Sequence, residues 1–179
     1  MAQRDAVDVI VSDHRHVEAL FSRVETGPTL DQAVLDELIR ELSIHAGIEE
    51  QVLYPAIRNK VDGGEGIADH SLDEHQEAKE LLASIEKGGV DDPQTPELLR
   101  KLIASVREHV QEEEGQILPK LRSSIAPEAL ITMGEALEKA KSMAPTHPHP
   151  RAPSTPPGNV IAGAPTALVD KARDAIKGR

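Results

Sequence analysis

His45-Ala-Gly-Ile-Glu-Glu-Gln-Val-Leu-Tyr-Pro55 is repeated without a gap as His109-Val-Gln-Glu-Glu-Glu-Gly-Gln-Ile-Leu-Pro119. Each copy carries a His followed four residues later by a Glu, and residues four apart lie on one face of an α-helix. The apolar residues around both copies recur at alternating spacings of three and four, which is typical of a helix that buries one face in a bundle. Each copy is therefore predicted to lie on a long helix that points its His and Glu into the core.

A second pair of helices repeats in the same way, with one His in each apolar stripe. The His of Asp13-His14 stands seven residues before Phe21, and that of Glu74-His75 stands seven before Leu82. Two hairpins related by a pseudo-twofold axis would bring all the His and Glu residues of these stripes to one level of the core. The set consists of His14, His45, Glu49, His75, His109 and Glu113.

Gly and Pro clusters divide the chain into segments that predict an all-α fold, an antiparallel up-down-up-down four-helix bundle. The bundle helices are expected over about 5–24, 30–60, 65–87 and 95–122, with a short fifth helix from about 127 to 144. This bundle domain covers residues 1–144. Within 145–179, the Pro-rich stretch 145–165, which contains His147 and His149, is expected to be a disordered linker. A short amphipathic segment over 167–177 would dock weakly or stay free.

The composition narrows the classes of function. A net charge of −11 argues against nucleic acid as a partner, because phosphate binding requires clusters of Lys and Arg. The absence of Cys excludes disulfides and thiolate ligands, so any metal must be held by nitrogen and oxygen. No apolar run approaches the roughly 20 residues that span a bilayer, and the N-terminus lacks a secretory signal. We therefore expect a cytoplasmic protein with no membrane partner; the oligomeric state is left open.

The two glutamates in the apolar stripes require a compensating charge. A buried carboxylate is costly unless it is paired, and Lys79 is the nearest long cation to the matching level of the stripes. Two metal ions bridged by both carboxylates and completed by four imidazoles would supply that charge, as in the di-iron and di-manganese centres of helical bundles. A single zinc ion held by two His and one Glu is the alternative, but it leaves half of the repeat without a role.

Each of these residues also has a simpler interpretation. A lone His in an apolar stripe is more often a core residue, and His-x-x-x-Glu is more often a surface pair, which would make the chain a metal-free helical interaction module. Two copies in the same heptad phase favour the metal. His16 is expected to face solvent, and three acidic residues are expected to form a solvated flank or to act as outer-shell partners: Glu50, Glu112 and Glu114.

The pattern resembles that of the hemerythrin-like, or HHE cation-binding, family. The resemblance covers about residues 5–122 and rests on Asp13-His14, on His45-x-x-x-Glu49 with Leu-Tyr-Pro after it, on Glu74-His75, and on His109-x-x-x-Glu113 with Ile-Leu-Pro after it. It implies a bundle with a non-haem centre of two iron ions, joined by an oxo or hydroxo bridge. It also implies that the six residues of the set are the ligands, with the two glutamates bridging.

The chain departs from the family pattern at one position. Oxygen-carrying hemerythrins resemble this pattern but use a fifth His, four residues before the ligand of the third helix, where Ser71 stands here. His70 is one residue away, rotated by roughly 100°, and would become a ligand only through a distorted helix. Tyr54 lies about one turn beyond Glu49. It would either supply an oxygen ligand or shield the site, or it would be a packing ring at a helix kink.

The loss of one imidazole makes the expected metal shell richer in oxygen ligands and more open. Reversible oxygen carriage requires one defined vacant position, so we expect instead a redox-active di-iron protein that reacts with hydrogen peroxide or oxygen. Catalase-like disproportionation in a response to oxidative stress would be its enzymatic activity. The alternative is a protein without turnover that carries or senses oxygen or nitric oxide, or that stores iron.

Overall fold

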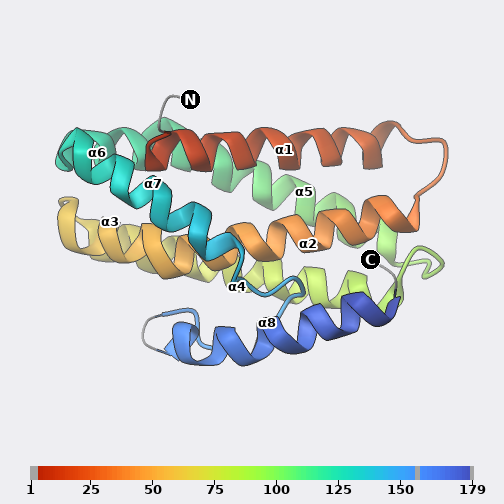
Figure 1. The fold of residues 1–179 in the computed structure, drawn as a ribbon. Coiled ribbons are helices and arrows are strands. Elements are labelled where there is room, and N and C mark those ends of the chain that lie inside the picture. Colours follow the sequence, from red (N-terminus) through yellow and green to blue (C-terminus); the bar gives the residue numbers. More distant parts are fainter. Residues whose placement is uncertain (1–3, 156–157, 178–179) are drawn as a thin grey trace.

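The computed structural model describes residues 4–155 and 158–177, and all the regular structure in these residues is helical. Figure 1 shows a bundle of long antiparallel rods, which confirms the predicted fold. Two rods are the single helices α1 (Ala6–Thr26) and α4 (Gly64–Gly88). The second rod joins α2 (Gln32–Ile48), the π-helical η1 (Glu49–Leu53) and α3 (Tyr54–Lys60). The fourth joins α5 (Thr95–Glu112), the π-helical η2 (Glu113–Ile117) and α6 (Leu118–Ser124).

Local chemistry sets the helix boundaries within a few residues of the expected ones. Asp5 caps α1 through a capping box: its side chain accepts from the Asp8 N–H at 2.9 Å, and the Asp8 side chain accepts from the Asp5 N–H. Before α4, Gly63 adopts a φ of 68°, a conformation that is strained for residues with a β-carbon. These end signals define the register in which the polar residues enter the core.

The apolar core forms two clusters, with the polar residues of the repeat between them. One cluster fills the end of the bundle near α3, α6 and the start of α1, and includes Val9, Ile10, Leu53, Ile57 and Leu121. The other fills the opposite end and includes Phe21, Leu35, Leu38, Leu82, Ile85, Leu99 and Leu102. The predicted heptad stripes are therefore buried, and the bundle holds its polar layer between two rigid apolar blocks.

The cluster at the end away from α3 allows a prediction about the stability of the fold. Leu102 is fully buried there, so Leu102→Ala should lower the free energy of unfolding by about 2–5 kcal/mol through lost burial and the cavity left behind. Leu168→Ala is the matched control, because Leu168 is 71% exposed and its loss should change stability by no more than about 0.5 kcal/mol. Urea unfolding of both variants measures the difference; equal effects would contradict this assignment of the core.

The expected fifth helix is α7 (Pro127–Lys141), which crosses α1 and α2. Gly134 permits the close crossing, because a β-carbon at that position would lie 2.5 Å from the carbonyl oxygen of Arg4. None of the helices in the described part of the chain combines the length and hydropathy that a membrane span requires.

The C-terminal segment (residues 145–177) differs from the prediction. The helix α8 (Gly158–Lys177) begins well before residue 167, and residues 145–155 lie against the bundle. His147 is only 4% exposed, and its Nε2 lies 2.8 Å from Asp174 of α8. The expectation of a disordered linker is therefore wrong for the described residues, while residues 156–157 lie outside them. Composition favoured disorder, but buried polar contacts at a few positions hold the segment.

Candidate metal centre

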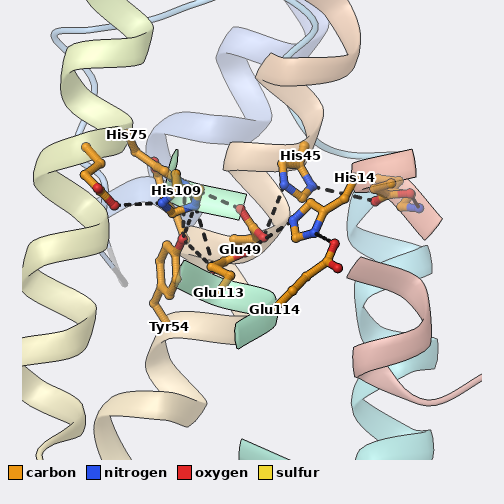
Figure 2. A network of polar contacts seen from close by, with 12 residues as sticks. His14, His45, Glu49, Tyr54, His75, His109, Glu113 and Glu114 are labelled. Carbon is orange, nitrogen blue, oxygen red and sulfur yellow. Dashed lines mark hydrogen bonds and ion pairs between the residues drawn. The ribbon is translucent and has the colours of Figure 1, made fainter. Parts of the chain in front are cut away.

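The six residues predicted as ligands meet in one buried layer between the two apolar clusters (Figure 2). None of them is more than 6% exposed. α1 and α4 each contribute one His, and each of the two composite rods contributes a His from the end of its long helix and a Glu from the start of its π-helical segment. The pseudo-twofold arrangement expected from the repeat is therefore present in the core.

The potential ligand atoms form two groups that share Glu49. The first group consists of His14, His45, Glu49 and Glu113, and the second of Glu49, His75 and His109; within each group these atoms lie within 4.8 Å of one another. Glu49 Oε1 lies 3.3 Å from His45 Nε2, and Glu49 Oε2 lies 3.4 Å from His75 Nε2. One carboxylate thus directs one oxygen at each group, which is the geometry that a bridging ligand requires.

Glu113 divides its oxygens in the same way. Its Oε2 lies 3.3 Å from His14 Nε2 in the first group, and its Oε1 lies 3.8 Å from His109 Nε2 in the second. Two carboxylates and four imidazoles are therefore placed around two neighbouring positions. Such an arrangement suits a pair of cations better than a single one.

Both glutamates begin a π-helical segment, a feature that the sequence pattern did not predict. The N–H of Tyr54 donates to the carbonyl of Glu49, and the N–H of Leu118 donates to that of Glu113, so each bond spans five residues. The next residue of each rod is Pro55 or Pro119, which has no N–H to continue a helical ladder. The proline that follows each Glu by six residues was the sequence signal that could have indicated these turns. π-helical turns are frequent at functional sites.

An acidic side chain faces the outer nitrogen of each imidazole. The distances from Nδ1 are 2.9 Å for His14 to Glu114, 3.1 Å for His75 to Glu50, 2.7 Å for His109 to Glu74, and 3.9 Å for His45 to Asp13, the last a contact without a hydrogen bond. The acidic residue before each single His, Asp13 or Glu74, contacts the His of the next composite rod. The acidic residue after each Glu of the layer, Glu50 or Glu114, contacts the His of α4 or of α1. Such partners orient an imidazole so that Nε2 presents its lone pair to a metal.

Cations cover three of these outer carboxylates. The N···O distances are 2.6 Å from Lys79 to Glu50, 2.6 Å from Arg15 to Glu114, and 2.7 Å from Lys141 of α7 to Asp13. Of the two roles expected for Glu50, a solvated position is wrong and that of a partner to a predicted ligand is the one observed, because Glu50 is 4% exposed and contacts His75. Glu112 does remain near solvent, and His16 is exposed as expected.

Removal of an outer carboxylate should weaken metal binding without removing a ligand. Glu74→Ala deprives the His109 ring of its partner and should lower metal affinity by about 10–100-fold. Glu77→Ala, at an exposed position on the same helix, is the control and should leave the affinity unchanged. Competition with a chromophoric chelator measures both; equal affinities in the two variants would show that Glu74 does not position the ring.

The electrostatics of the layer fit bound cations. Among the described residues, five buried atoms at its centre lack a hydrogen-bond partner: Nε2 of His14, Nε2 of His45, both oxygens of Glu49, and Oε2 of Glu113. Burial lowers the pKa of His45 to about 4, which leaves a neutral imidazole with a free lone pair at neutral pH. Burial and the charge of Glu113 raise the pKa of Glu49 well above its usual value. Cations at the centre would satisfy these atoms and allow both carboxylates to ionise.

The two residues whose role the sequence left open have different positions. The hydroxyl of Tyr54 points into the layer, 3.0 Å from His75 Nε2 and 3.3 Å from His109 Nε2, and it donates to Glu113 Oε1 at 3.0 Å. His70 is 59% exposed and faces Glu74 and Glu112 at the surface, as its rotation by one residue predicted. The buried layer therefore includes the phenol and excludes His70.

Comparisons with known proteins agree with this geometry. Residues 5–121 match the model of the hemerythrin HHE cation-binding domain. An uncharacterized hemerythrin-like protein of Schizosaccharomyces pombe is 30% identical over 173 residues, which cover 95% of this chain and 85% of that protein. A protein of Nostoc named DNA nickase is 31% identical over 137 residues, which cover 75% of this chain but only 38% of that protein.

A solved structure shares the fold. A hemerythrin HHE cation-binding domain-containing protein from Mycobacterium kansasii matches 77% of this chain and 88% of its own, with a TM-score of 0.66 at 22% identity. The chain belongs to the hemerythrin HHE cation-binding domain family. It carries that family's bundle with buried His and Glu clusters suited to metal binding.

Proposed function

We propose that the buried layer holds two iron ions and that the centre reacts with hydrogen peroxide or oxygen. In this proposal His14 and His45 would hold one ion, His75 and His109 would hold the other, and Glu49 and Glu113 would be shared by both. Bound iron would supply redox chemistry, exchanging two electrons with each peroxide molecule. The proposal rests on the family, on the two groups of potential ligand atoms, and above all on the Tyr54 hydroxyl beside the second group.

Tyr54 makes the two groups chemically different. Its hydroxyl adds an oxygen to the second group, which otherwise holds two imidazoles and the bridging carboxylates. Burial raises the pKa of Tyr54 well above 10, so in the metal-free protein the phenol keeps its proton and donates a hydrogen bond to Glu113. A carrier of oxygen would be served by an apolar, proton-poor pocket; a proton-bearing hydroxyl inside the layer favours chemistry in which oxygen–oxygen bonds break.

The residues can meet the proton balance of peroxide disproportionation. Two molecules of hydrogen peroxide give two of water and one of oxygen, so the protons released by oxidation of one molecule are consumed by reduction of the other. Two protons are released and two are taken up, so no external proton source is needed, and the Tyr54 hydroxyl would pass one of them from the first molecule to the second. The two apolar clusters exclude bulk water on either side.

Tyr54→Phe tests this role. It removes the hydroxyl and keeps the packing ring, so iron content should persist while peroxide turnover falls by about 100-fold or more, the usual scale for loss of an acid–base group. The visible spectrum separates two roles: loss of a phenolate-to-iron band identifies a ligand, and an unchanged spectrum identifies a proton donor. An unchanged turnover rate would contradict both.

The experiment that tests the function is iron analysis followed by an oxygen electrode on the same sample. Two irons per chain with oxygen evolution from peroxide would support the peroxide reaction. Two irons without evolution, together with a stable reversible oxygen complex of the reduced protein, would favour a carrier or sensor. Absence of stoichiometric metal would favour the metal-free interaction module, in which the four histidines could be replaced with little effect.

Nucleic acid is not part of the proposal. The Nostoc relative is named a DNA nickase, but the match covers only 38% of that protein. The net charge of −11 works against phosphate binding, and the proposed partner is a small molecule.

A further inference from the structure

A cavity of about 80 Å³ lies between the C-terminal segment and the bundle, beside the candidate metal centre. Its inner wall includes three residues of the buried layer, His45, His75 and His109, and its outer wall includes Pro148 and Pro153 of the C-terminal segment. We propose that this cavity is the chamber in which a small neutral molecule approaches the centre, and that the C-terminal segment is the wall that limits its size. That the molecule is hydrogen peroxide rests on the proposed function; the chamber itself does not.

The size and lining of the cavity select the class of ligand. Leu42, Ala78, Leu82 and Val106 contribute apolar surface from the helices α2, α4 and α5. Cavities for organic ligands usually exceed about 300 Å³. A cavity that holds one water-sized molecule needs only roughly 10–15 Å³. The space therefore fits a few molecules of the size of water, oxygen or peroxide.

The charges in the wall are already paired, which disfavours an ionic ligand. Lys79 Nζ lies 2.6 Å from Glu50 Oε1 and also donates to Ser154 of the C-terminal segment at 3.1 Å. Glu50 Oε1 is in turn 3.1 Å from His75 Nδ1. An anion would have to separate Lys79 from Glu50 and leave a carboxylate that is 4% exposed without its cation.

The C-terminal segment is held at the π-helical turn itself. In the π register the carbonyl of Glu50 would accept from the N–H of residue 55, which is a proline and has none. The side-chain amide of Asn159, at the start of α8, donates to that carbonyl at 3.1 Å. Gln76 of α4 donates to the carbonyl of Pro150 at 3.0 Å. The turn that positions Glu49 therefore also anchors the wall of the chamber.

Histidines of the C-terminal segment add one further attachment to the bundle and two contacts within the segment. His147 contacts Glu86 of α4 through Nδ1 and lies 2.8 Å from Asp174 through Nε2, and His149 lies 2.9 Å from Asp170. Similarity to the S. pombe protein extends over 95% of this chain, so it includes most of this segment as well as the bundle.

A second cavity touches the layer from the opposite side but is a poorer route. It has a volume of about 260 Å³ and reaches only His14 among the six predicted ligands. Glu114 covers the Nδ1 of that ring at 2.9 Å and is itself bound by Arg15. The cavity under the C-terminal segment reaches three imidazoles; Glu50 and Glu74 bind the Nδ1 atoms of two of them, but the Nδ1 of His45 has no hydrogen-bond partner.

Xenon binding tests the chamber independently of iron and of turnover. With metal-free, full-length protein, ¹²⁹Xe NMR should detect one site that is lost in Ala78→Phe, where the new ring fills the cavity, and kept in Ala104→Phe, at an exposed position on α5. Circular dichroism confirms that both variants fold. A xenon site in the second cavity would survive Ala78→Phe, so the chamber is overturned if the wild type shows no xenon site or only sites that survive Ala78→Phe.

A pair of peroxides of different size tests the wall. The iron-loaded wild-type protein, reduced beforehand, should be oxidised by hydrogen peroxide but be oxidised by tert-butyl hydroperoxide at least about tenfold more slowly than His147→Ala/Asn159→Ala, in which the C-terminal segment has lost its buried attachments. Each peroxide molecule would take two electrons from the two ferrous ions and two protons, giving water together with water or the alcohol, so no further reductant is needed. Leu168→Ala on the exposed face of α8 is the control. An equal ratio of the two rates in all three proteins would overturn the role of the segment, whereas no reaction with either peroxide would refute the proposed function and leave the xenon result to decide the chamber.

Discussion

Glu49→Gln is expected to abolish binding of both metal ions. The two oxygens of Glu49 face His45 on one side and His75 on the other, so replacement of one oxygen by an amide removes a ligand atom and the shared negative charge together. Gln has nearly the same volume as Glu, and the apolar clusters should therefore keep the bundle folded. Metal content per chain, measured after reconstitution and gel filtration, gives the result.

Two matched variants define how that result is interpreted. Glu108→Gln, at an exposed position beside His109, should keep both ions. His14→Ala removes a ligand of the first group alone and should leave the ion at His75 and His109. Retention of two ions by Glu49→Gln would show that Glu49 is not a bridge, and loss of both ions in His14→Ala would show that the two groups are not separable.

Removal of the metal should cause the largest loss of stability. A ligand at about 1,000 times its dissociation constant stabilises the folded state by about 4 kcal/mol, which corresponds to about 8–16 °C in Tm for a chain of this size. The physical reason lies in the unpartnered atoms of Glu49 and the imidazoles, which bound cations would satisfy. Calorimetry of the chelated and reloaded protein measures the shift; identical melting temperatures would contradict a metal that binds the folded state alone.

The metal-free protein should also lose stability in acid. The folded-state pKa of His45 is lowered from 6.5 to about 4, mainly because burial disfavours the charged ring. A lowered pKa gives stability that is fully present above pH 6.5 and is lost as the pH falls through about 4, on the order of 3 kcal/mol for this group. Urea unfolding between pH 7 and 4 should show a smaller decline for His45→Gln than for the control His16→Gln, whose ring is exposed.

The bundle and the set of potential ligands could be predicted because both follow from local periodicity. Residues three and four apart share a helical face, so the stripes through Phe21, Leu38 and Leu102 determined which side of each helix is buried. The same phase placed His45 with Glu49, and the internal repeat supplied the second hairpin. Rotation by one residue was enough to exclude His70 from the layer.

The outer carboxylates were only partly predictable. Asp13 and Glu74 stand out in the sequence because each precedes a single His, but their partners lie on the following rod. Glu50 belongs to a residue type that is usually exposed to solvent. Only the packing of α4 against its rod brings it to His75 and Lys79. Such contacts depend on the orientation of neighbouring helices, which no spacing within one helix specifies.

For this protein the amino-acid sequence by itself determined four helices, the faces that they bury and the six polar side chains at one level, because these follow from a period of 3.6 residues. The tertiary structure alone decided that Tyr54 enters the layer and that a Pro-rich segment forms one wall of a cavity beside the centre. The physical reason is that these features depend on contacts between residues distant in the chain. Asn159 donating to the carbonyl of Glu50 is one such contact, since the local signal, a proline without an N–H, does not specify which side chain takes its place.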